Sequence, residues 1–358
     1  MRSLAHAGSS QLCDPSRWLL YLQAVFWRVL MDLGMWQHNL PSPRPLKPRF
    51  VKYIDTTLAA IPGRIRLVFY APKDYGAPGN EGKKYPCIVN FHGRGFTLGT
   101  ASDDCQWATA LCEQADTVVC SVDYRRAPEH PFPNAVEDGT DAVMWVWDHA
   151  AELGIDGDRP GVSGFSAGGN MALTVPLKLQ DALLRRRGAE PPQVSSDAPV
   201  VLPHEHRAIK LSIPWYPLTD FTVTREERRK TITRLDKALP QFFNRLFDSS
   251  YLHPTEEVKP DSPYLSPGVA SDELLRFMPD EILMYTCEWD ELRAEAGRFT
   301  DRVKKLGKKI KYRMVEGVPH GWDRDPNPFK VNPVPLEVYA EVAKEIKRVF
   351  YGEQSNGQ

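Results

Sequence analysis

The chain has 358 residues, of which 42% are hydrophobic and 25% are charged, as in ordinary globular enzymes. Its formal net charge of −1 gives no electrostatic basis for binding nucleic acid. The six cysteines show neither a C-x-x-C pair nor a zinc-like spacing, and no metal or cofactor motif occurs. We therefore expect no cofactor, no obligatory disulfide and a reducing, cytoplasmic location.

The N-terminal segment Trp18–Trp36 is rich in tryptophan, leucine, phenylalanine and valine. Gln23, Arg28 and Asp32 interrupt it, so its apolar length is short for a membrane span. Asp14 precedes it and no small-residue cleavage site follows, which argues against a signal peptide. The main interpretation is a helix of a cap with a proline-rich connector behind it. A secretory signal and an anchor at a membrane interface or the endoplasmic reticulum are the alternatives.

Strand-like and helical patterns alternate through the rest of the chain. The predicted strands lie near 50–57, 64–70, 86–91, 117–123, 161–165, 208–214, 281–287 and 309–315. The predicted helices lie near 103–115, 134–152, 167–180, 240–249, 291–306 and 336–351. This alternation predicts an α/β fold with a mostly parallel, eight-stranded sheet covered by helices on both faces. The first two strands should form an antiparallel hairpin, and Pro160 should make the strand near 161–165 begin at Gly161 and be short.

Residues 217–265 interrupt this alternation and are rich in proline. With residues 1–48 they are predicted to form a cap, which leaves 49–216 and 266–358 as the two parts of the core. Residues 181–206 are polar and contain prolines, so we interpret them as a mobile surface loop. The basic runs Arg185–Arg187 and Arg225–Arg234 are interpreted as solvated surface.

Residues 164–168 read Gly-Phe-Ser-Ala-Gly between a strand-like run and a helical run. This is the G-x-S-x-G nucleophile elbow, in which a sharp strand-to-helix turn exposes a serine. Ser166 is the candidate nucleophile. Gly164 and Gly168 are explained by the lack of room for side chains two residues to either side.

A second motif follows the strand near 86–91 and reads His92-Gly93-Arg94-Gly95-Phe96. A strand that ends in His-Gly-x-Gly is typical of the loop that completes an oxyanion hole. By position, the donors would be the backbone N–H groups of Arg94, Gly95 and Ala167. His92 is interpreted as a buried histidine that braces this loop.

The partners of the serine are sought at two later strand ends. Asp290 follows the strand near 281–287, with Glu288 and Glu291 as competitors. His320 lies in a loop after the strand near 309–315 and can act as general base and then general acid. The chain order Ser166, Asp290, His320 is the order of α/β-hydrolases.

These motifs resemble the hormone-sensitive-lipase-like (fold-3) branch of the α/β-hydrolase family, in particular its fungal carboxylesterase-type members. The resemblance spans roughly residues 85–322 and is most specific in the stretch from Tyr124 to Pro133, Tyr-Arg-Arg-Ala-Pro-Glu-His-Pro-Phe-Pro. It implies that the N-terminal segment and the 217–265 insertion shape the acyl and alcohol sites. It also implies that four charged residues form salt-bridge scaffolding: Asp123, Arg125, Glu129 and Asp138.

Three positions depart from the family pattern. The usual His-Gly-Gly-Gly is here His-Gly-Arg-Gly, Arg126 stands for a leucine, and Ala294 stands for an acidic residue. Either the loop accepts Arg94 with a modest φ, or the oxyanion hole is distorted and would act weakly on ordinary esters. In the first case no strain arises; in the second the arginine costs about 1–3 kcal/mol.

The resemblance implies a serine carboxylesterase that cleaves a small-molecule carboxylic ester through an acyl-enzyme. Two alternatives are kept. One is a hydrolase of a fungal specialised-metabolite pathway that hydrolyses, condenses or lactonises one bulky substrate. The other is a catalytically silent ligand-binding protein, as in a plant hormone receptor that resembles this family but lacks the histidine; His320 speaks against it.

Overall fold

The computed structural model describes residues 15–40, 43–186, 208–324 and 332–352. These residues form one eight-stranded sheet in the order β1-β2-β4-β3-β5-β6-β7-β8. The antiparallel pairs are β1 with β2 and β2 with β4, and all the others are parallel. The strands are β1 Phe50–Asp55, β2 Arg64–Tyr70, β3 Tyr85–Phe91, β4 Val118–Asp123, β5 Ile155–Phe165, β6 Leu211–Trp215, β7 Glu281–Trp289 and β8 Lys309–Pro319.

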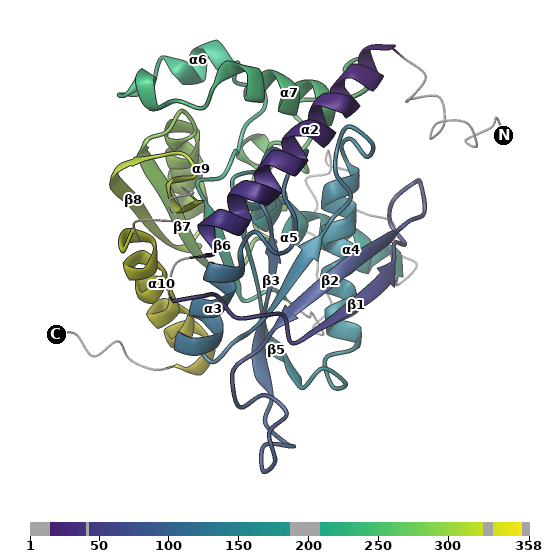
Figure 1. The fold of residues 1–358 in the computed structure, drawn as a ribbon, viewed down its shortest axis with the longest axis vertical. Coiled ribbons are helices and arrows are strands. Elements are labelled where there is room, and N and C mark those ends of the chain that lie inside the picture. Colours follow the sequence, from purple (N-terminus) through teal and green to yellow (C-terminus); the bar gives the residue numbers. More distant parts are fainter. Residues whose placement is uncertain (1–14, 41–42, 187–207, 325–331, 353–358) are drawn as a thin grey trace.

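Helices cover both faces of the sheet (Figure 1). On one face, α3 (Cys105–Gln114) and α10 (Val334–Tyr351) pack on side chains such as Val68, Ile88 and Ile213. On the other, α4 (Asn134–Asp148), α5 (Ala167–Arg186) and α9 (Arg293–Lys305) pack on the alternate side chains. The central strand β3 is buried along its whole length, as a parallel strand between two helix layers must be.

The prediction of an α/β sheet with a leading hairpin is confirmed. Several boundaries differ from the prediction: α4 ends at Asp148 and β8 at Pro319, and the largest differences are in β5 and α5. Strand β5 begins at Ile155, not at Gly161. It contains Pro160 because the pairing with β3 shifts register between Ile155 and Pro160, so the proline lies at an irregularity of the ladder. Helix α5 continues to Arg186, beyond the predicted end near 180, because Ala182 is still buried against the core. Residues 187–206 of the predicted loop lie outside the described residues.

The N-terminal segment forms helix α2 (Pro15–His38), which lies diagonally across one end of the molecule (Figure 1). Its arginines point inward. Arg17 is buried and donates to the carbonyls of Ser249 and Pro128, and Arg28 donates to the carbonyls of Thr97 and Ala127 and to the Glu129 carboxylate.

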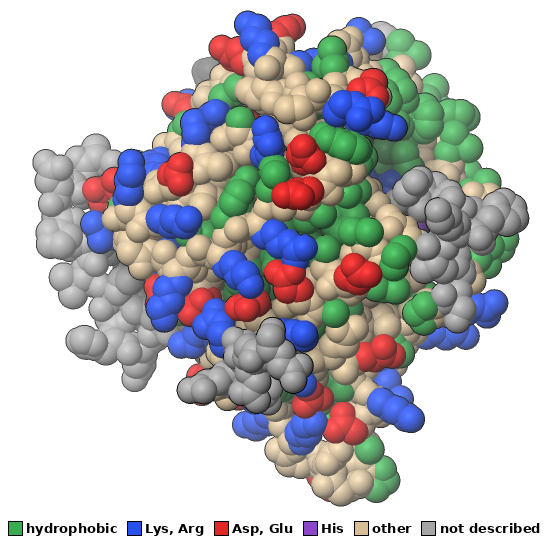
Figure 2. Space-filling model, turned by 90° about the vertical axis from the view of Figure 1, so that its left-hand side faces the viewer, with side chains coloured by type: hydrophobic (Ala, Val, Ile, Leu, Met, Phe, Trp, Pro, Cys, Tyr) green, Lys and Arg blue, Asp and Glu red, His purple; other side chains and the backbone are tan. Residues whose placement is uncertain are grey.

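Helix α2 exposes apolar side chains on its outer face. Seven of them are at least half exposed: Trp18, Leu19, Leu22, Phe26, Val29, Leu33 and Trp36. Hydrophobic side chains gather along the upper right-hand edge of the space-filling view (Figure 2). Within the described residues, no helix combines the length and hydropathy that a membrane span requires.

Three further helices belong to the described residues: α6 (Arg225–Arg229), α7 (Gln241–Tyr251) and α8 (Asp272–Leu275). One-turn 3₁₀ segments lie at Leu235–Lys237, Pro267–Val269 and Trp322–Arg324. Helices α6 and α7 lie with α2 at the same end of the molecule (Figure 1), and Trp27 of α2 packs on Phe242 and Phe243 of α7. We call α2 together with residues 217–265 the cap segments.

Candidate active site

Ser166 lies in a sharp turn between β5 and α5. Its φ is +55°, in the left-handed region that L-residues rarely occupy. A Cβ on Gly164 would lie 2.2 Å from the Gly168 carbonyl oxygen, and a Cβ on Gly168 would lie 1.9 Å from the Phe91 carbonyl oxygen. Both glycines of the motif are therefore explained by backbone that passes too close for any side chain.

The structure brings Ser166 together with the two predicted partners. The distance from His320 Nε2 to Ser166 Oγ is 2.8 Å, and the distance from His320 Nδ1 to Asp290 Oδ2 is 2.7 Å. Asp290 is 2% exposed, and its other oxygen accepts from the Leu292 N–H at 2.9 Å. A hydroxyl, an imidazole and a carboxylate in one hydrogen-bonded line is the arrangement of a serine proton relay.

The competing carboxylates have other partners. Glu288 Oε2 accepts from the Gly317 N–H at 2.7 Å, and so braces the start of the loop that carries His320. Glu291 pairs with Arg225. Among the three carboxylates considered, the structure places Asp290 against the imidazole.

The imidazole of His320 is held in a polar and partly buried environment. Burial by itself lowers the pKa of His320, but the charge and hydrogen bond of Asp290 outweigh this and raise the pKa above its ordinary value. The ring also meets the edge of Tyr216 at 4.9 Å between centroids. Tyr216 is fixed in turn by a hydrogen bond from its hydroxyl to Asp323.

The loop after β3 adopts a left-handed backbone. The φ angles of Arg94, Gly95 and Phe96 are +74°, +63° and +58°. The expectation that Arg94 could keep a modest φ is therefore wrong, and the arginine takes the strained conformation itself. Its side chain does not present a free cation, because Arg94 Nε pairs with Asp103 Oδ2 at 2.7 Å.

His92 is buried, as predicted, and braces this loop. Its ring stacks on Tyr124 with centroids 4.1 Å apart, and the Tyr124 hydroxyl donates to the His92 carbonyl at 2.9 Å. Burial lowers the pKa of His92 to about 4, so the ring is neutral near pH 7. Gly93, Arg94, Gly95, Ser166, Ala167 and His320 line one common pocket.

Comparison with known proteins gives one decisive match. A family model described as the alpha/beta hydrolase fold matches residues 88–324, about two thirds of the chain and all of the motif-bearing part. The chain belongs to this α/β-hydrolase family. It is the family whose hormone-sensitive-lipase-like branch the motifs resemble.

Relatives of this α/β-hydrolase include an AB hydrolase superfamily protein of Schizosaccharomyces pombe, 31% identical over 66% of this chain and 63% of its own length. Carboxylic ester hydrolase LipN of Mycobacterium tuberculosis is 30% identical over 75% of this chain and 65% of its own length. The chain thus aligns with slightly less than two thirds of these two relatives. A solved esterase of Pyrobaculum calidifontis superposes with a TM-score of 0.68 at 27% identity and covers 92% of both chains.

The pocket of this α/β-hydrolase lies between the carboxyl ends of the parallel strands and the cap segments. Helix α2 contributes Met31, and α7 contributes Phe243, Phe247 and Tyr251. Gly95 lies so close to α7 that a Cβ there would be 2.2 Å from the Phe247 ring. Aromatic side chains form much of the wall: Phe96, Phe165, Tyr216, Phe221, Phe243, Phe247, Tyr251 and Trp289.

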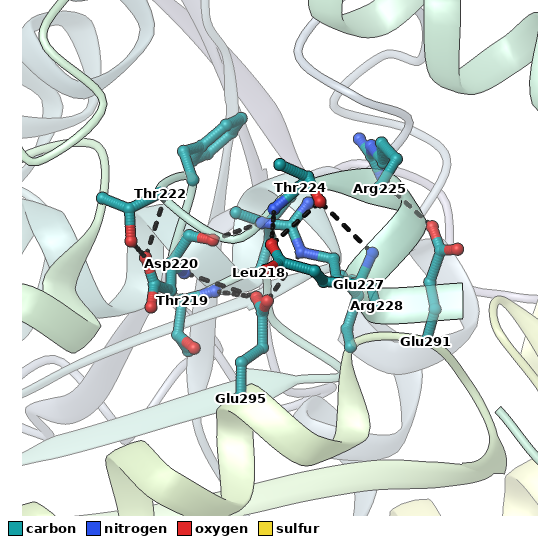
Figure 3. Close-up of polar contacts among 12 residues, drawn as sticks. Leu218, Thr219, Asp220, Thr222, Thr224, Arg225, Glu227, Arg228, Glu291 and Glu295 are labelled. Carbon is teal, nitrogen blue, oxygen red and sulfur yellow. Dashed lines mark hydrogen bonds and ion pairs between the residues drawn. The ribbon is translucent and has the colours of Figure 1, made fainter. Parts of the chain in front are cut away.

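Buried ion pairs fix the segment that follows β6. Glu295 of α9 accepts from the Thr219 N–H at 2.7 Å and from Arg228 Nε at 2.7 Å, and both of these charged side chains are at most 3% exposed. Figure 3 shows Glu295 below residues 218–220 and Glu291 beside Arg225. The interpretation of Arg225–Arg234 as solvated surface is therefore wrong for Arg225 and Arg228.

The sequence does contain a pattern that predicts the helix on which these two arginines lie. Thr224 and Glu227 form a capping box, which marks the start of helix α6 at Arg225. The pattern gives the helix, but the acidic partners lie far away in the sequence, so no local pattern indicates that Arg228 is buried. Residues of the long helix α9 and of α7 supply those partners.

The predicted scaffold of ion pairs is present. Arg125 pairs with Asp138 at 2.7 Å, and both side chains are at most 9% exposed. Asp123 pairs with Arg66 at 2.9 Å, and Glu129 pairs with Arg28 of α2 at 2.6 Å. The last of these joins the family's most specific motif to a cap segment.

Proposed function

We propose that this α/β-hydrolase is a serine carboxylesterase that cleaves a small-molecule carboxylic ester through an acyl-enzyme on Ser166. The observation that carries the proposal is the pair of short contacts, 2.8 Å and 2.7 Å, that joins Ser166 to His320 and His320 to Asp290 at the base of a pocket. The names of relatives support it, since LipN is called a carboxylic ester hydrolase and LipI an esterase.

Each residue has a role in the proposed reaction. Ser166 Oγ attacks the ester carbonyl while His320 Nε2 takes its proton, and the imidazolium is stabilised by Asp290. The proton then passes to the departing alcohol. Water, activated by the same imidazole, attacks the acyl-serine, and the acid leaves with the hydroxyl restored.

Negative charge on the carbonyl oxygen needs donors that are fixed before the reaction. We assign this role to the backbone N–H groups of Arg94, Gly95 and Ala167. The left-handed backbone at Arg94 and Gly95 and the position of Ala167 at the first turn of α5 support the assignment. Loss of one such donor typically costs on the order of 10²–10³ in rate.

We also propose the predicted division of the chain: residues 1–48 and 217–265 form a cap that shapes the pocket, and residues 49–216 and 266–358 form the core. The packing of Trp27 on α7 and the place of Met31 in the pocket wall support this. An aromatic wall of this kind suits a substrate with a bulky apolar group. Transfer of the acyl group to an alcohol, giving condensation or lactonisation, would use the same acyl-serine and remains the second proposal.

A fluorophosphonate probe tests the proposal directly. The wild-type enzyme should form one covalent adduct, at Ser166, and should hydrolyse p-nitrophenyl esters. Ser166→Ala should abolish both, while the control Ser102→Ala, at an exposed position, should retain them. The alternative of a catalytically silent binding protein would instead be supported if the folded wild-type protein formed no adduct and Ser166→Ala bound ligands as tightly as the wild type.

A further inference from the structure

On one side of the pocket, the cap segments and the residues after β7 together carry a group of charged and polar side chains that the proposed reaction does not use. Arg225, Asn244, Asp248 and Glu291 all line the pocket. Glu291 is 6% exposed and Asn244 is 4% exposed. Glu291 directly follows Asp290 in the chain, so it lies next to the proton relay.

The hydrogen-bond donors of Arg225 and Asn244 are distributed unevenly over the two carboxylates. Arg225 gives its fork to Asp248, from Nε to Oδ2 at 2.9 Å and from Nη2 to Oδ1 at 2.8 Å. Glu291 accepts hydrogen bonds at only one of its two oxygens: Arg225 Nη1 at 3.0 Å and Asn244 Nδ2 at 3.3 Å both donate to Oε1. Glu291 Oε2 and Asn244 Oδ1 are buried and accept from no group in the described part of the chain.

The neighbouring Glu295 shows what a carboxylate with a purely structural role looks like here. Its Oε1 accepts from the Thr219 and Asp220 N–H groups, and its Oε2 accepts from Arg228. Glu291 is among the residues that line the pocket, and Glu295 is not. Figure 3 shows both carboxylates with their partners. A buried acceptor without a donor is unfavourable, and more so when it is charged. Because Glu291 lines the pocket, a donor group of a ligand that reaches the unpartnered Oε2 would gain affinity there.

We propose that Glu291 Oε2, with the adjacent Asn244 Oδ1, is a substrate subsite that accepts a hydrogen bond from a hydroxyl or ammonium group of the ester. The three charged members Arg225, Asp248 and Glu291 carry a formal net charge of −1, which disfavours a substrate carboxylate at this point. This proposal rests on the proposed esterase function and adds the class of substrate to it.

The amide variant Glu291→Gln is a sharp test because its orientation is fixed in advance. Arg225 and Asn244 both donate to Oε1, so the single oxygen of glutamine must stay there. The amide NH₂ group then replaces Oε2, and an acceptor becomes a donor. A substrate group that donates a hydrogen bond to Glu291 in the wild-type enzyme would therefore face another donor in the variant, and the hydrogen bond would be lost.

The experiment uses two sets of esters, with the variable group at the end of the acyl chain or at the end of the alcohol. Within each set the terminal group is methyl, hydroxyl or ammonium on a chain of the same length. In the wild-type enzyme, we expect kcat/KM for at least one hydroxyl or ammonium ester to exceed that of its methyl counterpart by about 10-fold or more. Glu291→Gln should remove this preference, and Glu226→Gln, an exposed glutamate of α6, should keep it.

The outcomes separate this proposal from the one on which it rests. No preference in the wild-type enzyme, or a preference that survives in Glu291→Gln, overturns the subsite while ester hydrolysis stands. Absence of both hydrolysis and fluorophosphonate labelling overturns the esterase itself. Within each set, the wild-type enzyme ranks the three esters independently of the variant, so the absence of a preference overturns the subsite even if Glu291→Gln does not fold.

Discussion

The strand ends and the cap segments enclose the same pocket but are held in place by different forces. At the strand ends, backbone approaches backbone: a Cβ on Gly168 would lie 1.9 Å from the Phe91 carbonyl oxygen. In the cap segments, side chain meets side chain, as where Trp27 packs on Phe243 and Arg28 pairs with Glu129. The glycines of the first region should therefore tolerate no side chain, while we expect the second region to accept changes without disturbing the proposed relay.

Among changes that leave Ser166 in place, the largest effect on activity is expected from Asp290→Asn. The amide can no longer fix the tautomer of His320 or stabilise its positive charge, so kcat should fall by about 10²–10⁴-fold. Steady-state kinetics on p-nitrophenyl esters would measure it. Glu288→Gln is the matched control, and a loss of similar size there would show that the whole loop, and not the Asp290 contact, is what matters.

The close approach of backbone should appear as lost stability in Gly168→Ala. We expect the free energy of unfolding in urea to fall by more than about 3 kcal/mol, because the new Cβ would overlap the Phe91 carbonyl. Gly297→Ala on α9 is the control, since nothing lies within 4 Å of its Cβ position, and it should gain about 0.5–1 kcal/mol. Equal stability of the two variants would contradict this account of the elbow.

The contact of His320 with Asp290 predicts the acid side of the pH profile. The imidazole must be neutral to accept the serine proton, so kcat/KM should fall as the pH drops through the His320 pKa. That pKa is raised by Asp290, which places the midpoint above the ordinary value of about 6.5. A midpoint below this value would mean that burial, and not the carboxylate, dominates.

A smaller effect is expected from Trp27→Ala in the cap segments. Losing the packing on Phe242 and Phe243 should let α7 shift and raise KM for bulky esters several-fold. The rate of fluorophosphonate labelling should change little, because Trp27 lies outside the pocket lining. If labelling slowed as much as KM rose, the two regions would not be separable as described.

The smallest effect is expected from Arg94→Gly. The loop already holds the left-handed backbone that glycine favours, so activity on simple esters should change by less than about 10-fold. Relief of strain, about 1–3 kcal/mol, is opposed by the loss of the pair with Asp103. A much larger rise in activity would favour the earlier alternative that the arginine distorts the oxyanion loop.

The contrast between the two regions also explains how far the sequence could predict the molecule. Gly164 and Gly168, the strand patterns and the order of Ser166, Asp290 and His320 are local signals, and together they predicted the sheet and the residues that meet in it. The contact between Glu291 and Arg225 gave no such signal. These two residues are 66 positions apart in the chain, and their contact depends on how the cap segments fold back over the strand ends.

Removing an N-terminal extension is a common way to prepare a protein for crystallisation or assay. Here, a chain cut just before Phe50 would lose Met31 from the pocket wall and would leave the Glu129 carboxylate without its cation. The carbonyl groups of Thr97 and Ala127 would lose their donor at the same time. Ligand selectivity measured on such a shortened protein would therefore describe a different pocket from that of the 358-residue chain.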